Sequence, residues 1–143
     1  MTRLLRLGTI ALGAALVAVP IIDSGPAAAV GNPGIIVKLP ASGVLSSTGK
    51  AVRLGLKVTC SNMSPVPITV HLTQTRSQVR VTGSGTSGVA YKCNGATVTV
   101  PVSVSAKAGS RFIAGGASAN AAADCGGTSP CATDKRNVQL VHR

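Results

Sequence analysis

Four cysteines carry the most definite chemistry in this sequence, because paired thiols can form covalent cross-links. They are Cys60, Cys93, Cys125 and Cys131. Four cysteines allow three disulfide pairings. The short Cys-x5-Cys spacing of the last two favours a local bridge between them, which leaves Cys60 to pair with Cys93. A zinc site is disfavoured, because one such pair and two isolated cysteines do not match the ligand spacing of a zinc ribbon.

Groups suited to catalysis or metal binding are scarce. The chain has no glutamate, and beyond its N-terminal segment it has two acids, Asp124 and Asp134. Asp124 is expected to hydrogen-bond within its own turn. His71 and His142 lie far from any Cys or carboxylate cluster, so they are expected to be ordinary solvent-facing side chains. No nucleophile-elbow motif marks a reactive serine. The sequence therefore predicts a protein that is not an enzyme and needs no metal or cofactor.

Cations outnumber acids, with 14 Lys and Arg against 3 Asp and Glu and a formal net charge of +11. Spread around a domain, such cations would only confer solubility, whereas clustered on one sheet they would attract polyanions. The candidate polyanion-binding residues lie at outward positions or at the ends of expected strands. They are Arg53, Lys57, Arg80 and Lys92.

Aromatic side chains are nearly absent, since the chain has one Tyr (Tyr91), one Phe (Phe112) and no Trp. Binding of single-stranded nucleic acid relies on aromatic stacking, and no recognition helix is expected. Sequence-specific nucleic-acid binding is therefore disfavoured. The core has to be built from small aliphatic residues, so we expect the disulfides to supply much of the stability.

The segment Lys50–Cys60 shows the pattern around which the domain is expected to form. Val52, Leu54, Leu56, Val58 and Cys60 share one parity. Arg53 and Lys57 fall on the other. This period of two predicts a half-buried strand with Cys60 facing the core.

Further alternating segments predict about eight short strands separated by turns, a pattern typical of a β-sandwich or barrel. The other expected strands are Ile35–Leu39, Val66–Gln74, Gln78–Thr82, Val89–Cys93, Val98–Val104, Phe112–Ala123 and Asn137–His142. Ala41–Gly49 and Gly83–Gly88 are expected to be turns or loops, and Asn94-Gly95 a hairpin turn. Pro101 is expected at an exposed or edge position. Phe112–Ala123 is rich in alanine, so a helix is the alternative there, although its parity runs into Cys125 as a strand would.

The N-terminus resembles a secretory signal peptide over residues 1–29, followed by one domain over residues 30–143. A basic start precedes an apolar run and the small residues Ala27-Ala28-Ala29. The rival interpretation is an uncleaved membrane anchor, but the run is short for a span and is broken by Pro20 and Asp23. We therefore expect no membrane span after cleavage. Export also favours oxidised cysteines.

The chain resembles the small exported immunoglobulin-like domains of actinobacteria, through Lys57-Val-Thr-Cys60, Val70-His-Leu-Thr-Gln74, Tyr91-Lys-Cys93 and the Asp124-Cys125…Cys131 loop. The resemblance implies an all-β, immunoglobulin-like antiparallel sandwich of seven or eight strands with two disulfides, and no known activity.

The chain is also similar to the neocarzinostatin-type chromophore-binding apoproteins in size, in export and in the Asp124-Cys125…Cys131 loop. Cys60 and Cys93, however, are far apart, whereas the first pair of those proteins closes a short loop. Their ligand cleft uses aromatic side chains that this sequence lacks, so no ligand-binding residue is carried over.

Two functional hypotheses follow. The first is a monomeric, non-enzymatic secreted module that binds anionic cell-wall or extracellular polymers through its basic surface. The alternative is a small-molecule carrier with an apolar cleft.

Overall fold

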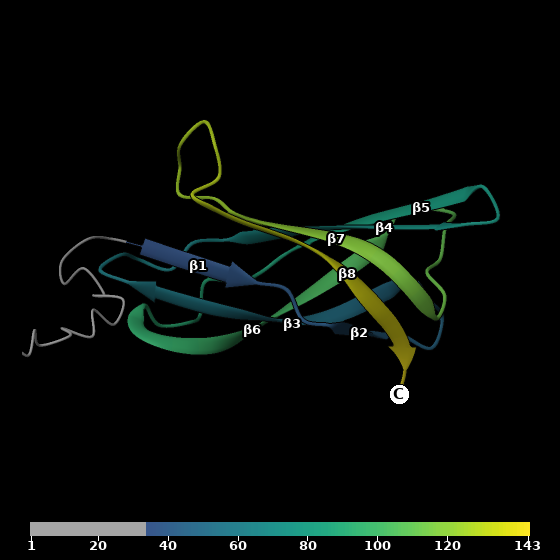
Figure 1. Ribbon diagram of the computed structural model, residues 1–143, viewed down its shortest axis with the longest axis horizontal. Coiled ribbons are helices and arrows are strands. Elements are labelled where there is room, and N and C mark those ends of the chain that lie inside the picture. Colours follow the sequence, from purple (N-terminus) through teal and green to yellow (C-terminus); the bar gives the residue numbers. More distant parts are fainter. Residues whose placement is uncertain (1–33) are drawn as a thin grey trace, which may run out of the picture. The chain divides into compact units, whose positions relative to one another are not determined.

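A computed structural model describes residues 34–143 (Figure 1). The signal peptide expected over residues 1–29 lies outside them. In this part of the chain every regular element is a strand, and no helix is long and apolar enough to cross a membrane. The strands are β1 (Gly34–Lys38), β2 (Ser42–Leu45), β3 (Ala51–Ser61), β4 (Ile68–Arg76), β5 (Val79–Thr86), β6 (Asn94–Ala106), β7 (Gly115–Ala123) and β8 (Ala132–His142).

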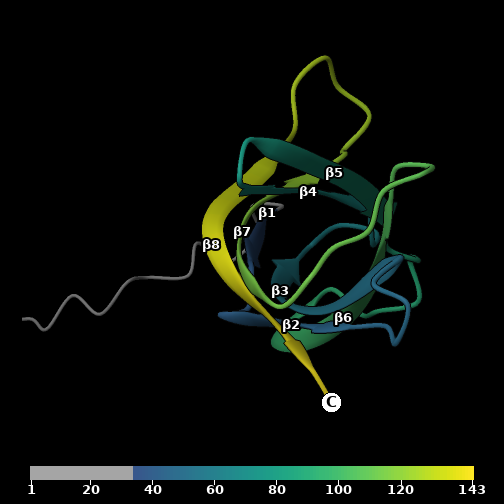
Figure 2. The same ribbon diagram turned by 90° about the vertical axis from the view of Figure 1, so that its right-hand side faces the viewer.

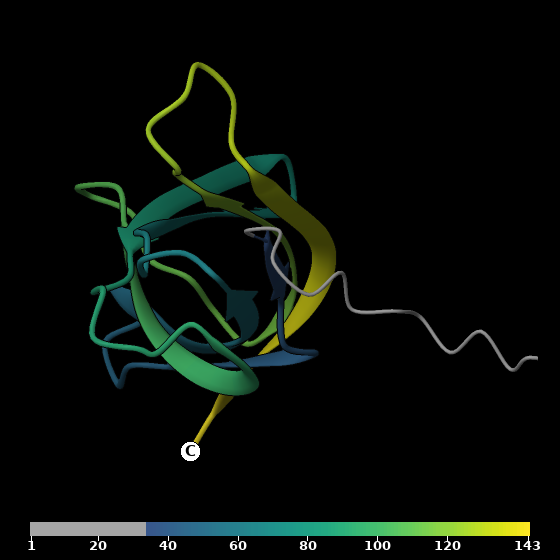
Figure 3. The same ribbon diagram turned by 90° about the vertical axis from the view of Figure 1, so that its left-hand side faces the viewer.

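The sheet closes on itself. β3 pairs with β1 and β2 along one edge and with β6 along the other, and the order β3-β2-β8-β7-β4-β5-β6 returns to β3. Figures 2 and 3 look along the resulting seven-stranded barrel from its two ends. An all-β fold with two disulfides is therefore confirmed. The antiparallel two-sheet sandwich is corrected in two respects, because the sheet is closed and because β2 pairs with β8 in parallel.

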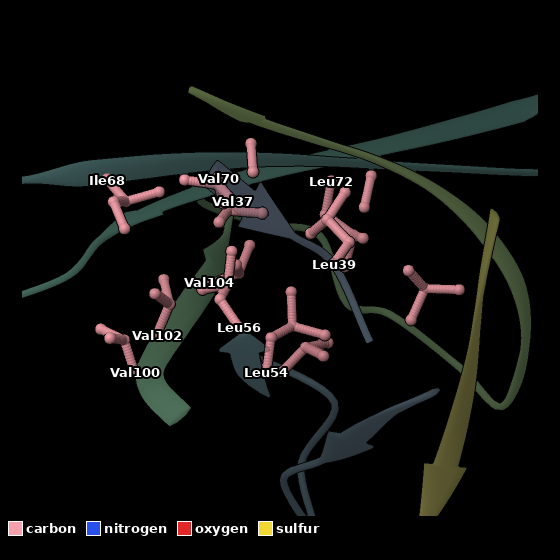
Figure 4. Packing of buried hydrophobic residues seen from close by; sticks show 14 of the residues in the cluster. Val37, Leu39, Leu54, Leu56, Ile68, Val70, Leu72, Val100, Val102 and Val104 are labelled. Atoms are coloured by element: carbon pink, nitrogen blue, oxygen red, sulfur yellow. The ribbon is translucent and has the colours of Figure 1, made fainter. Parts of the chain in front are cut away.

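Small aliphatic side chains fill the interior of the barrel. The inward residues of β3, from Val52 to Cys60, are all buried, as their alternation predicts. The apolar residues of the neighbouring strand β6 lie beside them, and those of β4 face them across the barrel (Figure 4). Burial of this apolar area is the main driving force for closure. The interior is a packed core, because alternating side chains from every strand point into it.

The alanine-rich segment forms the strand β7, so the helical alternative for Phe112–Ala123 is excluded. Ala117, Ala119, Ala121 and Ala123 are buried, and β7 pairs with β4 on one side and β8 on the other. Alanine favours helices in isolation. Here the pairing edges of two neighbouring strands override that preference, and the small side chains let β7 lie close to the core.

Two segments expected to be irregular are strands. Ala41–Gly49 contains β2, which pairs with β3 and β8. Gly83–Thr86 continues β5, and its glycines permit close approach to β6. A methyl group on Gly83 or Gly85 would overlap the carbonyl oxygen of Ser105 or Ser103, respectively.

Two other expectations for the middle of the chain are wrong. Val89–Cys93 is a loop, with Val89 exposed. The Tyr91 hydroxyl holds this loop by donating to Val66 O (2.6 Å) and accepting from Val66 N (3.0 Å). Asn94-Gly95 starts β6 at a β-bulge, because the register against β3 shifts there and Gly95 has a φ of 86°.

The edge position expected for Pro101 is confirmed. One edge of β6 pairs with β3. The other edge pairs with β5 only at Ser105 and Ala106, so at Pro101 this edge has no ladder partner. A proline, which has no N–H to donate, is tolerated on such an edge.

Both expected disulfides are present, Cys60–Cys93 and Cys125–Cys131. The first joins the end of β3 to the loop before β6. The second closes the base of the exposed loop between β7 and β8, which projects from the barrel in Figure 1. Two disulfides are consistent with an extracellular or otherwise oxidising environment.

Candidate anion-binding face

The outer surface of β3 carries two exposed cations, Arg53 and Lys57. They share their parity with Gly55 and Thr59, which are half-buried, while every intervening residue faces the core. The strand alternation therefore holds both cations on one face of the barrel. Four residues separate them, a distance of about 13 Å along a strand that rises about 3.3 Å per residue.

A third cation joins them on the neighbouring strand. Lys38 of β1 lies directly opposite Lys57 in the antiparallel ladder, and both residues are exposed. Directly opposed side chains have Cβ atoms about 4.5–5.5 Å apart, and like charges in that position are destabilising. The β1–β3 register therefore concentrates positive charge at one place on the barrel.

Hydroxyl groups on β6 line the other side of the cations. Lys57 Nζ donates to Thr99 Oγ1 at 2.7 Å, and the hydroxyls of Thr59 and Thr97 lie 2.6 Å apart. Ser103 lies opposite Arg53. We call the group Lys38, Arg53, Lys57, Thr97, Thr99 and Ser103 the β3 cationic face. Its ammonium, guanidinium and hydroxyl groups are all hydrogen-bond donors to anionic oxygens.

A shallow depression of about 520 Å³ lies beside Arg53, over β2, β3 and β6. Its lining includes Gly55, which has no side chain. Arg53, Arg143, Ser42 and Ser103 contribute polar groups to its lining. Arginine forms bidentate hydrogen bonds with phosphate and carboxylate groups, so this depression extends the β3 cationic face with a recess suited to an anion.

The structure separates the other two candidate cations from Arg53 and Lys57. Arg80 pairs with Thr75 near the tip of the β4–β5 hairpin. Lys92 is exposed in the loop next to Cys93, beyond the end of β3. Neither lies on a strand paired with β3 at Arg53 or Lys57, because the partners there are β1, β2 and β6.

Sequence reasoning missed Lys38. Lys38 directly follows the buried Val37 in a short strand, so strand alternation predicts that its side chain points outward. The parity could not reveal that β1 pairs with β3 in a register that places Lys38 against Lys57.

Both described carboxylates accept hydrogen bonds from the backbone. Asp124 Oδ1 accepts from Gly126 N at 2.9 Å, which confirms the expected turn. Asp134 Oδ2 accepts from Leu39 N at 2.7 Å, and Arg136 Nη1 donates to Leu39 O at 2.9 Å. Asp134 and Arg136 thus fix the corner between β1 and β2 against β8, a structural role.

The histidines lie apart from these acids. His71 is exposed on β4 between Ser84 and Asn120, and His142 is exposed at the end of β8. Within residues 34–143, no group of three His, Cys, Asp or Glu side chains is placed to hold a metal ion.

A second, mostly apolar depression of about 480 Å³ lies at the other end of the barrel. It is lined by Gly34, Ile35, Met63, Ser64, Val66, Cys125 and Cys131. It is open to solvent, and the Cys125–Cys131 disulfide forms part of its wall.

No protein-family model matches this chain, and no curated protein matches it in sequence.

Proposed function

We propose that this protein is a secreted, monomeric, non-enzymatic module that binds anionic polymers of the cell envelope or extracellular space through the β3 cationic face. One observation carries the proposal, the direct opposition of Lys38 and Lys57 on adjacent strands. A like-charged pair in this position lowers the stability of the free protein. An anionic polymer bound over this face would compensate both charges and so remove that repulsion.

The arrangement of donors suits a polymer with repeated phosphate, sulfate or carboxylate groups. Lys38 and Lys57 supply point charges, Arg53 can bind one anion through two hydrogen bonds, and the β6 hydroxyls add neutral donors. About 13 Å of strand separates Arg53 from Lys57, so a chain lying along β3 would contact cations at two places. Such binding draws on counterion release and weakens with salt.

Secretion is part of the proposal. The signal-peptide pattern of residues 1–29 would direct the domain to a compartment where its disulfides persist. Removal of that segment takes Arg3, Arg6 and Asp23 with it, so the remaining domain keeps nearly all of the positive charge. We retain the relationship to exported immunoglobulin-like domains as a hypothesis, with a closed barrel as its point of difference.

Retention on an immobilised heparin or phosphopolymer column tests the proposal. We expect the mature protein to bind at about 0.15 M salt, where charges are screened over about 8 Å. Lys38→Glu/Lys57→Glu should elute at much lower salt. Lys107→Glu/Lys135→Glu is the matched control, because it changes the net charge equally at two exposed lysines away from the face.

Arg136 is unsuitable as a control, because its guanidinium holds Leu39. Equal losses in the two double variants would show that net charge alone causes retention. Absence of retention by the unmodified protein would contradict polymer binding.

The carrier hypothesis rests on the apolar depression beside the Cys125–Cys131 disulfide. Its volume of about 480 Å³ falls within the range of small-molecule sites, about 300–1,000 Å³. Val66→Asp would place a charge in its wall and should abolish uptake of an apolar probe dye. Unchanged dye binding in that variant would reject this depression as a ligand site.

A further inference from the structure

The end of the barrel opposite the Cys125–Cys131 loop combines exposed apolar and cationic side chains. Figure 2 looks onto this end, and Figure 1 shows the β4–β5 hairpin extending to the right. A depression of about 210 Å³ here is lined by Gln74, Arg76, Val79, Val81, Arg111 and Ile113. We call Arg76, Val79, Arg80, Arg111 and Ile113 the hairpin end.

Two aliphatic side chains at the hairpin end are exposed. Val79 is 64% exposed and Ile113 is 40% exposed, whereas the adjacent Phe112 is buried at 1%. The segment therefore turns its aromatic ring into the barrel and its isoleucine out. Since most other large apolar side chains of the domain are buried, two exposed ones lining the same depression call for an explanation.

A buried amide fixes the backbone of Ile113. Gln74 is only 2% exposed. Its Oε1 accepts from Ile113 N at 3.0 Å, and its Nε2 donates to Ile113 O at 2.9 Å. The two bonds replace a strand partner for Ile113. The outward direction of this side chain is thus built into the fold.

The hairpin turn has the usual two-residue geometry. Ser77 and Gln78 have φ values of 45° and 69°. Positive φ at both central residues is what a tight two-residue hairpin turn requires. The resulting tight turn places Arg76 opposite Val79.

Arg76 and Arg111 lie beside the two exposed apolar residues. Arg76 Nη1 donates to Ala114 O at 3.3 Å, and Arg111 lines the same depression. Arg80 extends from the other face of the hairpin, opposite Thr75. Asp134 is the ladder partner of Ala121, which lies towards the end of β7 farther from the hairpin end. Asp124 directly follows β7. The carboxylates of Asp124 and Asp134 are therefore remote from the hairpin end.

We propose that the hairpin end docks reversibly on the surface of an anionic lipid bilayer. Val79 and Ile113 would enter the boundary between headgroups and acyl chains, and Arg76 and Arg111 would bind lipid phosphates. Interfacial binding of this kind combines buried apolar area with attraction to anionic lipids. The surface is separate from the β3 cationic face, so the two interactions are independent.

Sedimentation with vesicles of phosphatidylcholine alone, and with an equal share of phosphatidylglycerol, tests this inference. We expect binding to the anionic vesicles only. Arg76→Gln/Arg111→Gln should weaken it roughly 25-fold, since each cation near an anionic surface contributes about fivefold. Val79→Ser/Ile113→Ser should weaken it roughly tenfold, through lost apolar burial.

Ile36→Ser/Val89→Ser is the matched control, because these residues are 57% and 53% exposed at other places on the barrel. It should bind vesicles like the unmodified protein. Thermal unfolding of each variant confirms that it is folded. Equal loss in the control, equal binding to neutral vesicles, or no vesicle binding would overturn the inference. Lys38→Glu/Lys57→Glu should lose the polymer while keeping most vesicle binding, so failure of one proposal is distinguishable from failure of the other.

Discussion

Lys38 on β1 and Lys57 on β3 are directly opposed in the barrel, and both are exposed to solvent. Lys57 also donates to Thr99 on β6, so its ammonium group is held on the side of β3 away from β1. Lys38 and Lys57 therefore share one face with Arg53, where their charges have consequences for both stability and binding.

Removing one of these charges should stabilise the free protein. Lys38→Gln is expected to raise the free energy of unfolding by about 0.2–1 kcal/mol at low salt, because it removes a repulsive cross-strand pair. Urea denaturation measures the change. Lys135→Gln is the control, since Lys135 faces the neutral Asn120. A gain that persists at 1 M salt would contradict an electrostatic origin, because screening then acts over about 3 Å.

The two disulfides should contribute unequally. Replacing Cys60 and Cys93 by alanine opens a loop of about 34 residues and should cost about 3.8 kcal/mol by the chain-entropy relation. Replacing Cys125 and Cys131 opens a loop of about 7 residues and should cost about 2.4 kcal/mol. Chemical denaturation of the two double variants checks the order. A larger loss from the second pair would show that the loop between β7 and β8 supports the barrel more than its exposure indicates.

Closure of the barrel between β5 and β6 depends on Gly85. Gly85→Ala should destabilise the protein by several kcal/mol or prevent folding, because its methyl group would overlap the carbonyl oxygen of Ser103. Gly116→Ala is the control, since nothing lies within 4 Å of a Cβ placed there. It should be neutral or slightly stabilising. Similar stabilities for the two variants, measured by thermal unfolding, would contradict the close approach of the two strands.

Gln74 should be required for an ordered hairpin end. Gln74→Leu keeps a similar side-chain volume but removes both bonds to Ile113, and should cost about 1–3 kcal/mol for the unpaired backbone groups. Gln139→Leu, at an exposed position, should have little effect. Hydrogen exchange at Ile113 N should accelerate in the first variant alone. Unchanged protection there would show that other contacts hold this segment.

Local alternation was enough to predict several parts of the fold. The inward faces of β3, β6 and β7 follow from sequence parity, and Cys60 reaches the core because it shares the parity of its strand. Irregular-looking segments were harder to interpret. β2 has only Val44 and Leu45 as apolar signals, and it is a strand because β3 and β8 lie on either side of it.

The segments containing Gly83, Gly85 and Asn94-Gly95 were predicted wrongly for a physical reason. Gly83 and Gly85 favour a loop in isolation, but here they admit close contact with β6. Asn94-Gly95 favours a hairpin turn, but the pair forms a bulge. Barrel closure and the opposition of Lys38 to Lys57 depend on long-range strand register, which one strand's pattern does not contain.

The salt dependence of polymer binding tests the central proposal most directly. The association constant of a labelled heparin oligosaccharide, measured by fluorescence anisotropy, should fall linearly with salt on logarithmic axes. For Lys38→Gln/Lys57→Gln, we expect the slope to be shallower by about 1.4, taking about 0.7 per neutralised cation as for single strands. Lys107→Gln/Lys135→Gln should keep the original slope. An equal change of slope in both double variants, or an unchanged slope in the first, would contradict a binding site on the β3 cationic face.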